Sequence, residues 1–153
     1  MNRMPETYSQ IYIHIIFAVK GRENLILEDS ESRIYQYISG IIKHKGQKPL
    51  AVNGMPDHIH LLIGMKPTCC LSALIQEVKK ASNQMIRETR LCKNNFAWQE
   101  GYAAFSYSHS SLNNVIGYIN DQKHHHKKQS FREEYKNLLN DFRIDYKEEQ
   151  LFD

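Results

Sequence analysis

Cysteine is scarce in this sequence, and the few that occur do not build a framework. The 153 residues include three cysteines: Cys69 and Cys70 are adjacent, and Cys92 stands apart. An odd set with an adjacent pair is neither a disulfide scaffold nor a CxxC metal-binding knuckle. We therefore expect all three thiols to be reduced and structural.

Long hydrophobic runs are also missing. No apolar stretch approaches the length that crosses a bilayer, and residues 1–10 lack the apolar centre of a signal peptide. Hydrophobic residues make up 41% of the chain and charged residues 24%, as in ordinary soluble proteins. We expect one cytoplasmic domain, residues 1–153, without a membrane partner.

A strong excess of either charge is absent, although the charge is uneven. The formal net charge is +3. Residues 141–153 carry five acidic and two basic side chains, a net −3 that leaves +6 on the first 140 residues. This balance permits a polyanionic partner such as nucleic acid without requiring one.

The first half of the chain alternates between strand and helix patterns. Residues 8–20 alternate between two faces and are rich in β-branched and aromatic side chains, which predicts a long first strand. Residues 27–46 space isoleucines helically between an acidic start and a basic end followed by glycine, which predicts a helix. Short apolar runs at about 50–53 and 58–65 flank a turn at 54–57 and predict an antiparallel hairpin.

The second half continues with a helix, a strand and two further helices. Residues 71–90 carry apolar side chains at helical spacing, and residues 101–110 return to strand alternation. A helix is predicted at about 111–128. Another is predicted at about 130–144, beginning with the Ser-x-x-Glu pattern of a capping box.

The resulting order is βαββαβ followed by two helices. We predict an α+β protein of the ferredoxin-like type, a four-stranded antiparallel sheet with helices on one face and additional C-terminal helices. This architecture hosts RNA-binding proteins, metal carriers and enzymes alike, so it does not indicate a function by itself.

The predicted hairpin contains a pair of histidines. The segment PDHIHLLIGM places His58 and His60 in a run typical of a buried strand. Side chains two residues apart in a strand project to the same face, so the two imidazoles can converge on one point. A structural interpretation is also open, in which one histidine is satisfied in the core and the other lies at the strand edge.

A second polar pair lies on the predicted helix at 111–128. Tyr118 and Gln122 are four residues apart and therefore neighbours, on the flank of an apolar stripe. A tyrosine is nucleophilic only as its phenolate, and a phosphodiester is attacked readily only when a cation withdraws charge from its non-bridging oxygens. Two histidines on a strand and one side-chain amide on a helix would hold such a cation. The stripe consists of Leu112, Val115, Ile116 and Ile119.

In order, these segments resemble the HUH endonucleases, in which U is a large hydrophobic residue. More closely, they resemble the single-tyrosine transposases of small insertion sequences that move as single-stranded DNA. HIH lies within DHIHLLI, and YINDQ follows sixty residues later. The resemblance covers most of the chain, from YIHIIFAVKGRENL through FAWQEGYAAFSYSHS to YINDQKHHHKKQSFREEYKNLL.

The resemblance implies a metal-dependent transposase that nicks and rejoins single-stranded DNA through a 5′-phosphotyrosine intermediate. Tyr118 matches the catalytic tyrosine, and His58, His60 and Gln122 match the ligands of a divalent ion, usually Mg²⁺ or Mn²⁺. Asp57 is predicted to orient His58 from behind. The resemblance also implies a homodimer, in which the tyrosine helix of one subunit can serve the other, and hairpin-containing DNA as partner.

Several basic residues are candidates for DNA contacts, with solvated surface positions as the alternative. The histidines at 124–126 cannot share one ion, because consecutive helical residues point about 100° apart. His14 lies on a strand face with Tyr12 and is either structural or DNA-facing. The candidates for DNA binding are Lys20, Arg22, Lys79, Arg87, His125 and His126.

Two other functions are compatible with the sequence. A rolling-circle nickase of plasmid replication or mobilisation would use the same HUH site, although such proteins are commonly longer. A domesticated, non-catalytic nucleic-acid-binding protein would use the same sheet, and the spacing of HIH and YINDQ would then be accidental.

Overall fold

The first strand, β1 (Tyr12–Ala18), is an inner strand of the sheet. The computed structural model describes residues 6–93 and 95–152. The other strands are β2 (Lys48–Met55), β3 (His58–Gly64) and β4 (Ala103–Tyr107), and their order across the sheet is β2-β3-β1-β4. All neighbours are antiparallel, which confirms the predicted α+β fold with its ferredoxin-like strand order.

The hairpin between β2 and β3 is tighter than its sequence suggests. Residues 54–57 have turn composition, but β2 continues to Met55, so only Pro56 and Asp57 separate the strands. Gly54 pairs with Ile59, and a Cβ added at Gly54 would lie 2.3 Å from the carbonyl oxygen of His58. This glycine therefore permits a close backbone approach within the sheet and does not form the turn.

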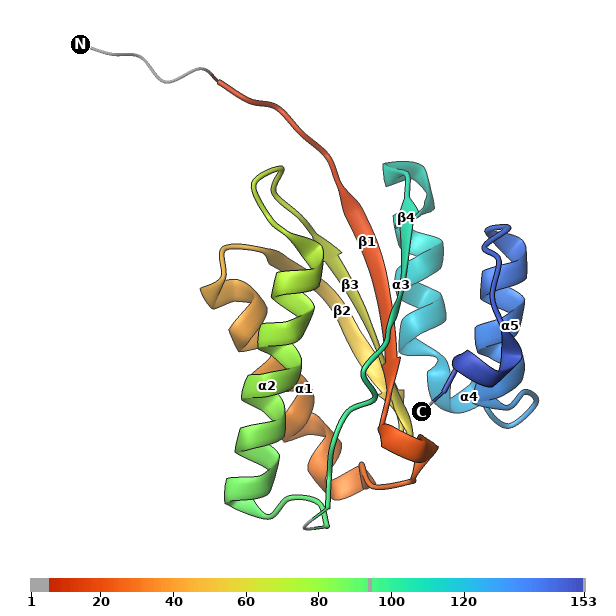
Figure 1. Cartoon of the computed structure of the whole chain (residues 1–153). Coiled ribbons are helices and arrows are strands. Elements are labelled where there is room, and N and C mark those ends of the chain that lie inside the picture. The colour runs from red at the N-terminus through yellow and green to blue at the C-terminus, as the bar shows by residue number, and fades with distance from the viewer. Residues whose placement is uncertain (1–5, 94, 153) are drawn as a thin grey trace.

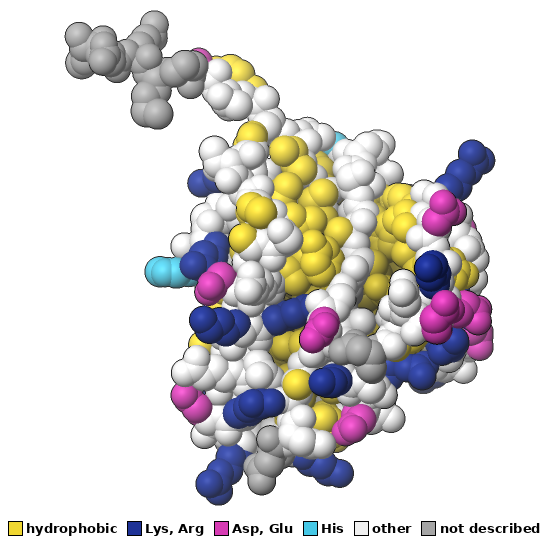
Figure 2. All heavy atoms as spheres, viewed as in Figure 1, with side chains coloured by type: hydrophobic (Ala, Val, Ile, Leu, Met, Phe, Trp, Pro, Cys, Tyr) yellow, Lys and Arg dark blue, Asp and Glu magenta, His cyan; other side chains and the backbone are white. Residues whose placement is uncertain are grey.

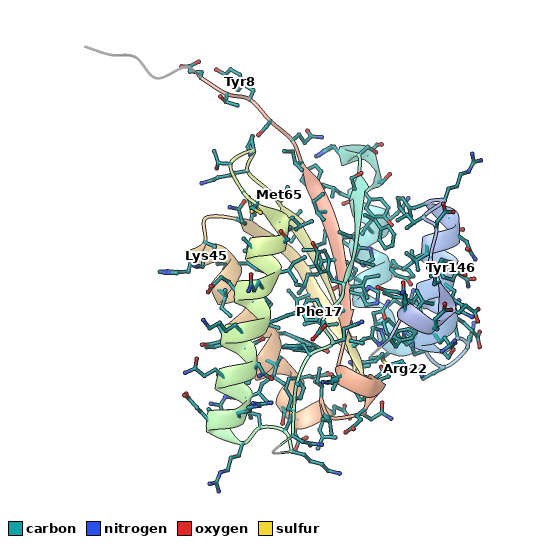
Figure 3. The ribbon with its side chains drawn as sticks, in the orientation of Figure 1. Tyr8, Phe17, Arg22, Lys45, Met65 and Tyr146 are labelled. Atoms are coloured by element: carbon teal, nitrogen blue, oxygen red, sulfur yellow. The ribbon has the colours of Figure 1, made fainter. Side chains whose placement is uncertain are left out.

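One face of the sheet is covered by the helices α1 (Glu28–His44) and α2 (Leu71–Thr89), as Figure 1 shows. The odd-numbered residues of β1 point to this side, and Phe17 lies between the sheet and α2 in Figure 3. The Phe17 ring meets the Trp98 ring edge to face at 4.9 Å between centroids. The buried side chains that the two helices add to this cluster are Ile34, Ile38, Ile42, Leu74, Ile75, Val78 and Ile86.

The opposite face is covered as well, by the C-terminal helices (Figure 1). The sequence predicted helices on one face only. This is correct for α1 and α2 but wrong for the C-terminal helices, which lie on the other face. Ile16 and Ala18, in the other phase of β1, are fully buried against Phe131, Tyr135 and Leu139 of the last helix, α5 (Phe131–Asp141). Because the inner strands carry buried apolar side chains in both phases, with Ile16, Ala18 and Leu62 on this side, both faces of the sheet need a cover.

The helix predicted at 111–128 is shorter and interrupted. A 3₁₀ turn at His109–Ser111 leads into α3 (Leu112–Asn120), and a separate turn of helix, α4 (Gln122–His125), follows after Asp121. Asp121 leaves helical geometry with ψ of 18°. Its N–H nevertheless bonds the carbonyl oxygens of Gly117 at 3.0 Å and Tyr118 at 3.3 Å, so the two helices stay joined.

The last helix agrees with its prediction at the start and ends three residues early. The Ser130 hydroxyl accepts a hydrogen bond from the Glu133 N–H, as expected for a capping box. In the described part of the chain, no helix is long and apolar enough to span a membrane.

Candidate metal and nucleophile site

His58 and His60 lie side by side on the face of β3 that points to α3, α4 and α5. Both are fully buried, and their ring centroids are 5.1 Å apart. Ile59, between them in the sequence, points to the other side of the sheet and belongs to the hydrophobic cluster beneath α1 and α2. The alternation of the strand therefore brings the two imidazoles together, as the sequence predicts.

Gln122 approaches the histidine pair from α4. Its side chain is fully buried, and its Oε1 lies 3.3 Å from Nε2 of His58. Gln122 is the first residue after the break at Asp121. The structure thus brings together the three side chains that the sequence proposes as ligands.

Glu134 is a site residue that the sequence reasoning missed. This carboxylate of α5 is 1% exposed. Its Oε1 lies 3.1 Å from Nε2 of His60 and 3.4 Å from Nε2 of His58, and its Oε2 accepts a 3.1 Å hydrogen bond from the Gln122 amide. The sequence signal was an acid inside the apolar stripe of α5, between Phe131 and Tyr135.

His126 also belongs to this cluster. Its Nε2 lies 3.1 Å from Oε1 of Gln122 and 3.1 Å from Oε1 of Glu134. The sequence placed His126 among the DNA contacts, but this ring packs inward against His58 at 4.7 Å between centroids. His125 instead lies against the Tyr118 ring at 4.7 Å.

Both strand histidines are held from behind at Nδ1. Nδ1 of His58 lies 2.7 Å from Oδ1 of Asp57, the residue predicted to orient it. Nδ1 of His60 lies 2.8 Å from Nε2 of His14. Each ring therefore presents Nε2 to the space shared by Gln122 and Glu134.

Burial and hydrogen bonds set the charge of the cluster. Burial alone would raise the pKa of Glu134, but hydrogen bonds from His126, His58 and His60 outweigh it and hold that pKa far below its usual range. Burial lowers the pKa of His60 to about 4 and that of His14 well below its ordinary value. Burial also acts against protonated His58, but Asp57 and Glu134 outweigh it and raise its pKa. A carboxylate thus faces a neutral His60 at neutral pH.

The donor set fits a divalent metal ion. One ligand atom each from His58, His60 and Glu134 lies within 4.8 Å of the others. The contacts of 3.1 to 3.4 Å between donors resemble the separation of adjacent ligands around an octahedral ion, about 3.0 Å for bonds of about 2.1 Å. Imidazole nitrogens with amide and carboxylate oxygens suit an ion of intermediate softness such as Mn²⁺, and also Mg²⁺.

Tyr118 closes the cluster on the side of α3. Its half-buried hydroxyl donates a hydrogen bond to Oε2 of Glu134, and its ring lies 5.9 Å from the ring of His60. Burial, and then the negative charge of Glu134, raise the pKa of Tyr118. The phenol is therefore protonated at neutral pH and needs an acceptor before it can attack.

Comparison with known proteins identifies the family. Residues 7–122 match the family model described as "Transposase IS200 like". The chain belongs to the IS200-like transposase family. It is accordingly an enzyme of DNA recombination associated with mobile elements, and the match extends from the N-terminal side of β1 to Gln122.

Individual relatives of this IS200-like transposase are distant. ISDra2 transposase TnpA of Deinococcus radiodurans is 23% identical over 119 residues, which cover 74% of this chain and 84% of the relative. Among solved structures, a candidate transposase from Deinococcus radiodurans has a TM-score of 0.62 at 20% identity and covers 80% of this chain and 98% of its own. A REP-associated tyrosine transposase bound to a REP hairpin has a TM-score of 0.57 at 17% identity, covering 81% and 74%. Both structures share the fold.

The predicted DNA contacts divide between the two faces. Lys79 and Arg87 are on α2, across the sheet from Tyr118: Nζ of Lys79 donates to carbonyl oxygens of the 99–101 loop, and Nε of Arg87 donates to that of Phe96. Figure 2 shows Lys and Arg spread over the α2 side with Asp and Glu among them. Lys20 and Arg22 lie in the 3₁₀ turn directly after β1, and the Arg22 guanidinium lies 4.5 Å from the centroid of the Phe152 ring.

Proposed function

We propose that this IS200-like transposase cuts and rejoins single-stranded DNA through a covalent bond between Tyr118 and a 5′ phosphate. One observation carries the proposal: the Tyr118 hydroxyl, both strand histidines and the Gln122 amide all meet a single buried carboxylate, Glu134. A nucleophile and a set of metal-binding donors therefore lie within one site of one chain.

The cleavage step follows from this geometry. The Tyr118 oxygen attacks phosphorus, a Tyr–O–P bond forms, and the bond from phosphorus to the 3′ oxygen breaks and leaves a 3′ hydroxyl. The hydrogen bond to Glu134 orients the Tyr118 hydroxyl, and the phenolic proton is transferred to the departing 3′ oxygen as the new bond forms. Attack of a second 3′ hydroxyl on the phosphotyrosine reverses the exchange, so joining needs no external energy source.

A divalent ion, Mg²⁺ or Mn²⁺, would be held by His58, His60 and Gln122, and we add Glu134 as a fourth ligand. When bound, the ion withdraws charge from the non-bridging phosphate oxygens. The neutral state of His60 supports this assignment, because a metal binds the unprotonated nitrogen. Asp57 fixes the ring of His58 by its hydrogen bond to Nδ1.

The proposed DNA partner is single-stranded and carries a hairpin near the end of the element. The fold shared with a REP-associated tyrosine transposase bound to a REP hairpin supports this partner. We also propose a homodimer. The sheet edge at β4 offers a row of backbone groups to a second copy, since in the described residues β4 pairs only with β1.

Tyr118 lies beside the His60 of its own chain, which favours an active site completed within one subunit. A dimer in which each tyrosine serves the partner would require α3 to leave this position.

A denaturing gel with labelled single-stranded DNA tests the function. The substrate is the DNA that flanks the gene, and the wild type is compared with Tyr118→Phe in Mn²⁺, in Mg²⁺ and with chelator. A metal-dependent DNA fragment that is linked to the protein through its 5′ phosphate and is lost in Tyr118→Phe supports the proposal. Binding of this DNA by a folded wild type without a covalent product would favour the non-catalytic binder instead.

A further inference from the structure

We infer that His14 is a positioning residue, which holds His60 in the orientation and tautomer that metal binding requires. The inference deepens the proposed metal site and rests on it. The sequence alone left His14 as either a structural residue or a DNA-facing one. It is fully buried beneath the C-terminal helices, so direct contact with DNA is excluded in this conformation.

The sheet brings His14 to His60. Within the pairing of β1 and β3, Ile16 is opposite His60 and His14 is opposite Leu62, so the two histidines are diagonal neighbours on one face. Their rings stack at 5.0 Å between centroids with 25° between the planes. Nε2 of His14 lies 2.8 Å from Nδ1 of His60, a short hydrogen bond inside the core.

Through this bond, His14 determines which nitrogen of His60 carries the ring hydrogen. Metal binding at Nε2 of His60 requires the ring hydrogen on Nδ1, from which it donates to Nε2 of His14. The hydrogen of His14 is then on its own Nδ1. That atom is buried and has no hydrogen-bond partner among the residues that the structure describes.

Without a cation, the donors and acceptors of these hydrogen bonds are exchanged. Nε2 of His60 then donates to Oε1 of Glu134, 3.1 Å away, and Nδ1 accepts from Nε2 of His14. Each neutral ring keeps one hydrogen in both arrangements. A histidine at position 14 can serve both, because its Nε2 either donates or accepts, whereas the carboxylate of Asp57 behind His58 only accepts when ionised.

An unpartnered buried ring nitrogen destabilises a protein, so a purely structural role would favour an apolar side chain here. Phe105 and Tyr107 lie next to the His14 ring, at 6.2 and 6.1 Å between centroids, and surround it with aromatic rings. The hydrogen bond to His60 is what an imidazole adds at this position.

The experiment compares His14→Leu and His14→Gln with the wild type. Mn²⁺ affinity is measured by titration calorimetry and by the loss of the free Mn²⁺ electron paramagnetic resonance signal, and thermal unfolding is followed in chelator. His14→Leu should weaken Mn²⁺ binding by about 10- to 100-fold without lowering the unfolding temperature. His14→Gln, whose amide can donate or accept, should recover most of the affinity.

Phe105→Leu serves as the packing control. It alters the same apolar neighbourhood without touching the hydrogen bond, so it should lower the unfolding temperature and leave Mn²⁺ affinity unchanged. A folded His14→Leu variant with wild-type Mn²⁺ affinity would overturn the inference. A wild type that binds no Mn²⁺ would instead refute the proposed metal site, which is a separate result.

A spectroscopic measurement on the wild type covers the case in which His14→Leu does not fold. Long-range ¹H–¹⁵N correlation spectra of the imidazoles are recorded with chelator and with Mg²⁺. The expected change on metal binding is a hydrogen on Nδ1 of both His14 and His60. A His14 that keeps its hydrogen on Nε2 in the metal-bound protein would contradict the role.

Discussion

Helices cover both faces of the sheet, but the side chains buried on the two faces differ greatly in polarity. Beneath α1 and α2 the buried side chains form an almost entirely hydrophobic cluster. Beneath α3, α4 and α5 the hydrophobic residues surround His14, His58, His60, Gln122 and Glu134, all nearly or fully buried. Burial on the first face stabilises the fold. On the second face, burial of polar groups lowers the free energy of unfolding, and these groups form the candidate site.

The extent of the family match divides the candidate site into two parts. The family match ends at Gln122, whereas His126 and Glu134 lie beyond it. The last helix therefore supplies a carboxylate to a site whose other candidate residues are within the matched region.

The largest expected effect tests the hydrophobic face. Ile38→Ala removes a fully buried side chain from α1 and should reduce the free energy of unfolding by about 2 to 5 kcal/mol. Mn²⁺ affinity of the folded fraction should stay the same, because the site is on the other face. Urea unfolding and Mn²⁺ titration measure the two quantities, and a large loss of affinity would show that the faces are not independent.

A pH titration of stability tests the polar face. His60 has a pKa of about 4 when folded against about 6.5 when unfolded, so the unfolded chain binds the proton first as pH falls. Stability in chelator should therefore be fully present above about pH 6.5 and decline toward pH 4, with His60 alone contributing a loss of about 3 kcal/mol. His14 adds to this loss, and His58, whose pKa is raised, opposes it.

Urea midpoints between pH 7.5 and 4 measure this dependence. His60→Gln should flatten the curve. An equally steep curve in that variant would place the proton uptake elsewhere.

Glu134→Gln tests the carboxylate that joins the metal donors to the tyrosine. Loss of the negative charge should weaken Mn²⁺ binding by at least about 10-fold. Glu133→Gln is the matched control, since Glu133 is the neighbouring exposed glutamate of the same helix and should bind Mn²⁺ as the wild type does. Equal affinities in both variants would remove Glu134 from the ligand set.

The smallest expected effects concern DNA binding at the surface. Lys20→Ala should weaken single-stranded DNA binding severalfold and reduce the salt slope by about one charge, because Lys20 follows the strand end where Ala18 pairs with His58. Arg87→Ala, on the opposite face, should bind DNA like the wild type. Fluorescence anisotropy at several salt concentrations checks this, and the reverse ranking would move the DNA path to α2.

The sequence predicted the strands and the pair of histidines well, because a period of two residues fixes which side chains share a face. His58 and His60 needed only that rule. It did not predict the second helical layer, since the burial of Ile16 and Ala18 depends on a helix more than a hundred residues away. Glu134 was missed for a related reason: an acid in an apolar stripe becomes interpretable only when its partners on β3 and α4 are known.

The helical pattern also did not predict the break at Asp121 between α3 and α4. The stripe from Leu112 to Ile119 continues without a proline or glycine at the break, so periodicity alone favours one helix. Tyr118 and Gln122 are still neighbours, as predicted, because the Asp121 N–H keeps its hydrogen bonds to α3.

The central claim is that Tyr118 becomes covalently attached to DNA, and mass spectrometry tests it most directly. The protein is incubated with flanking single-stranded DNA and Mn²⁺, the DNA is digested to a short remnant, and peptides are sequenced. The account predicts a nucleotide linked through its 5′ phosphate to the peptide that contains Tyr118. A phosphonucleotide on another residue, such as the nearby Tyr107, would contradict it.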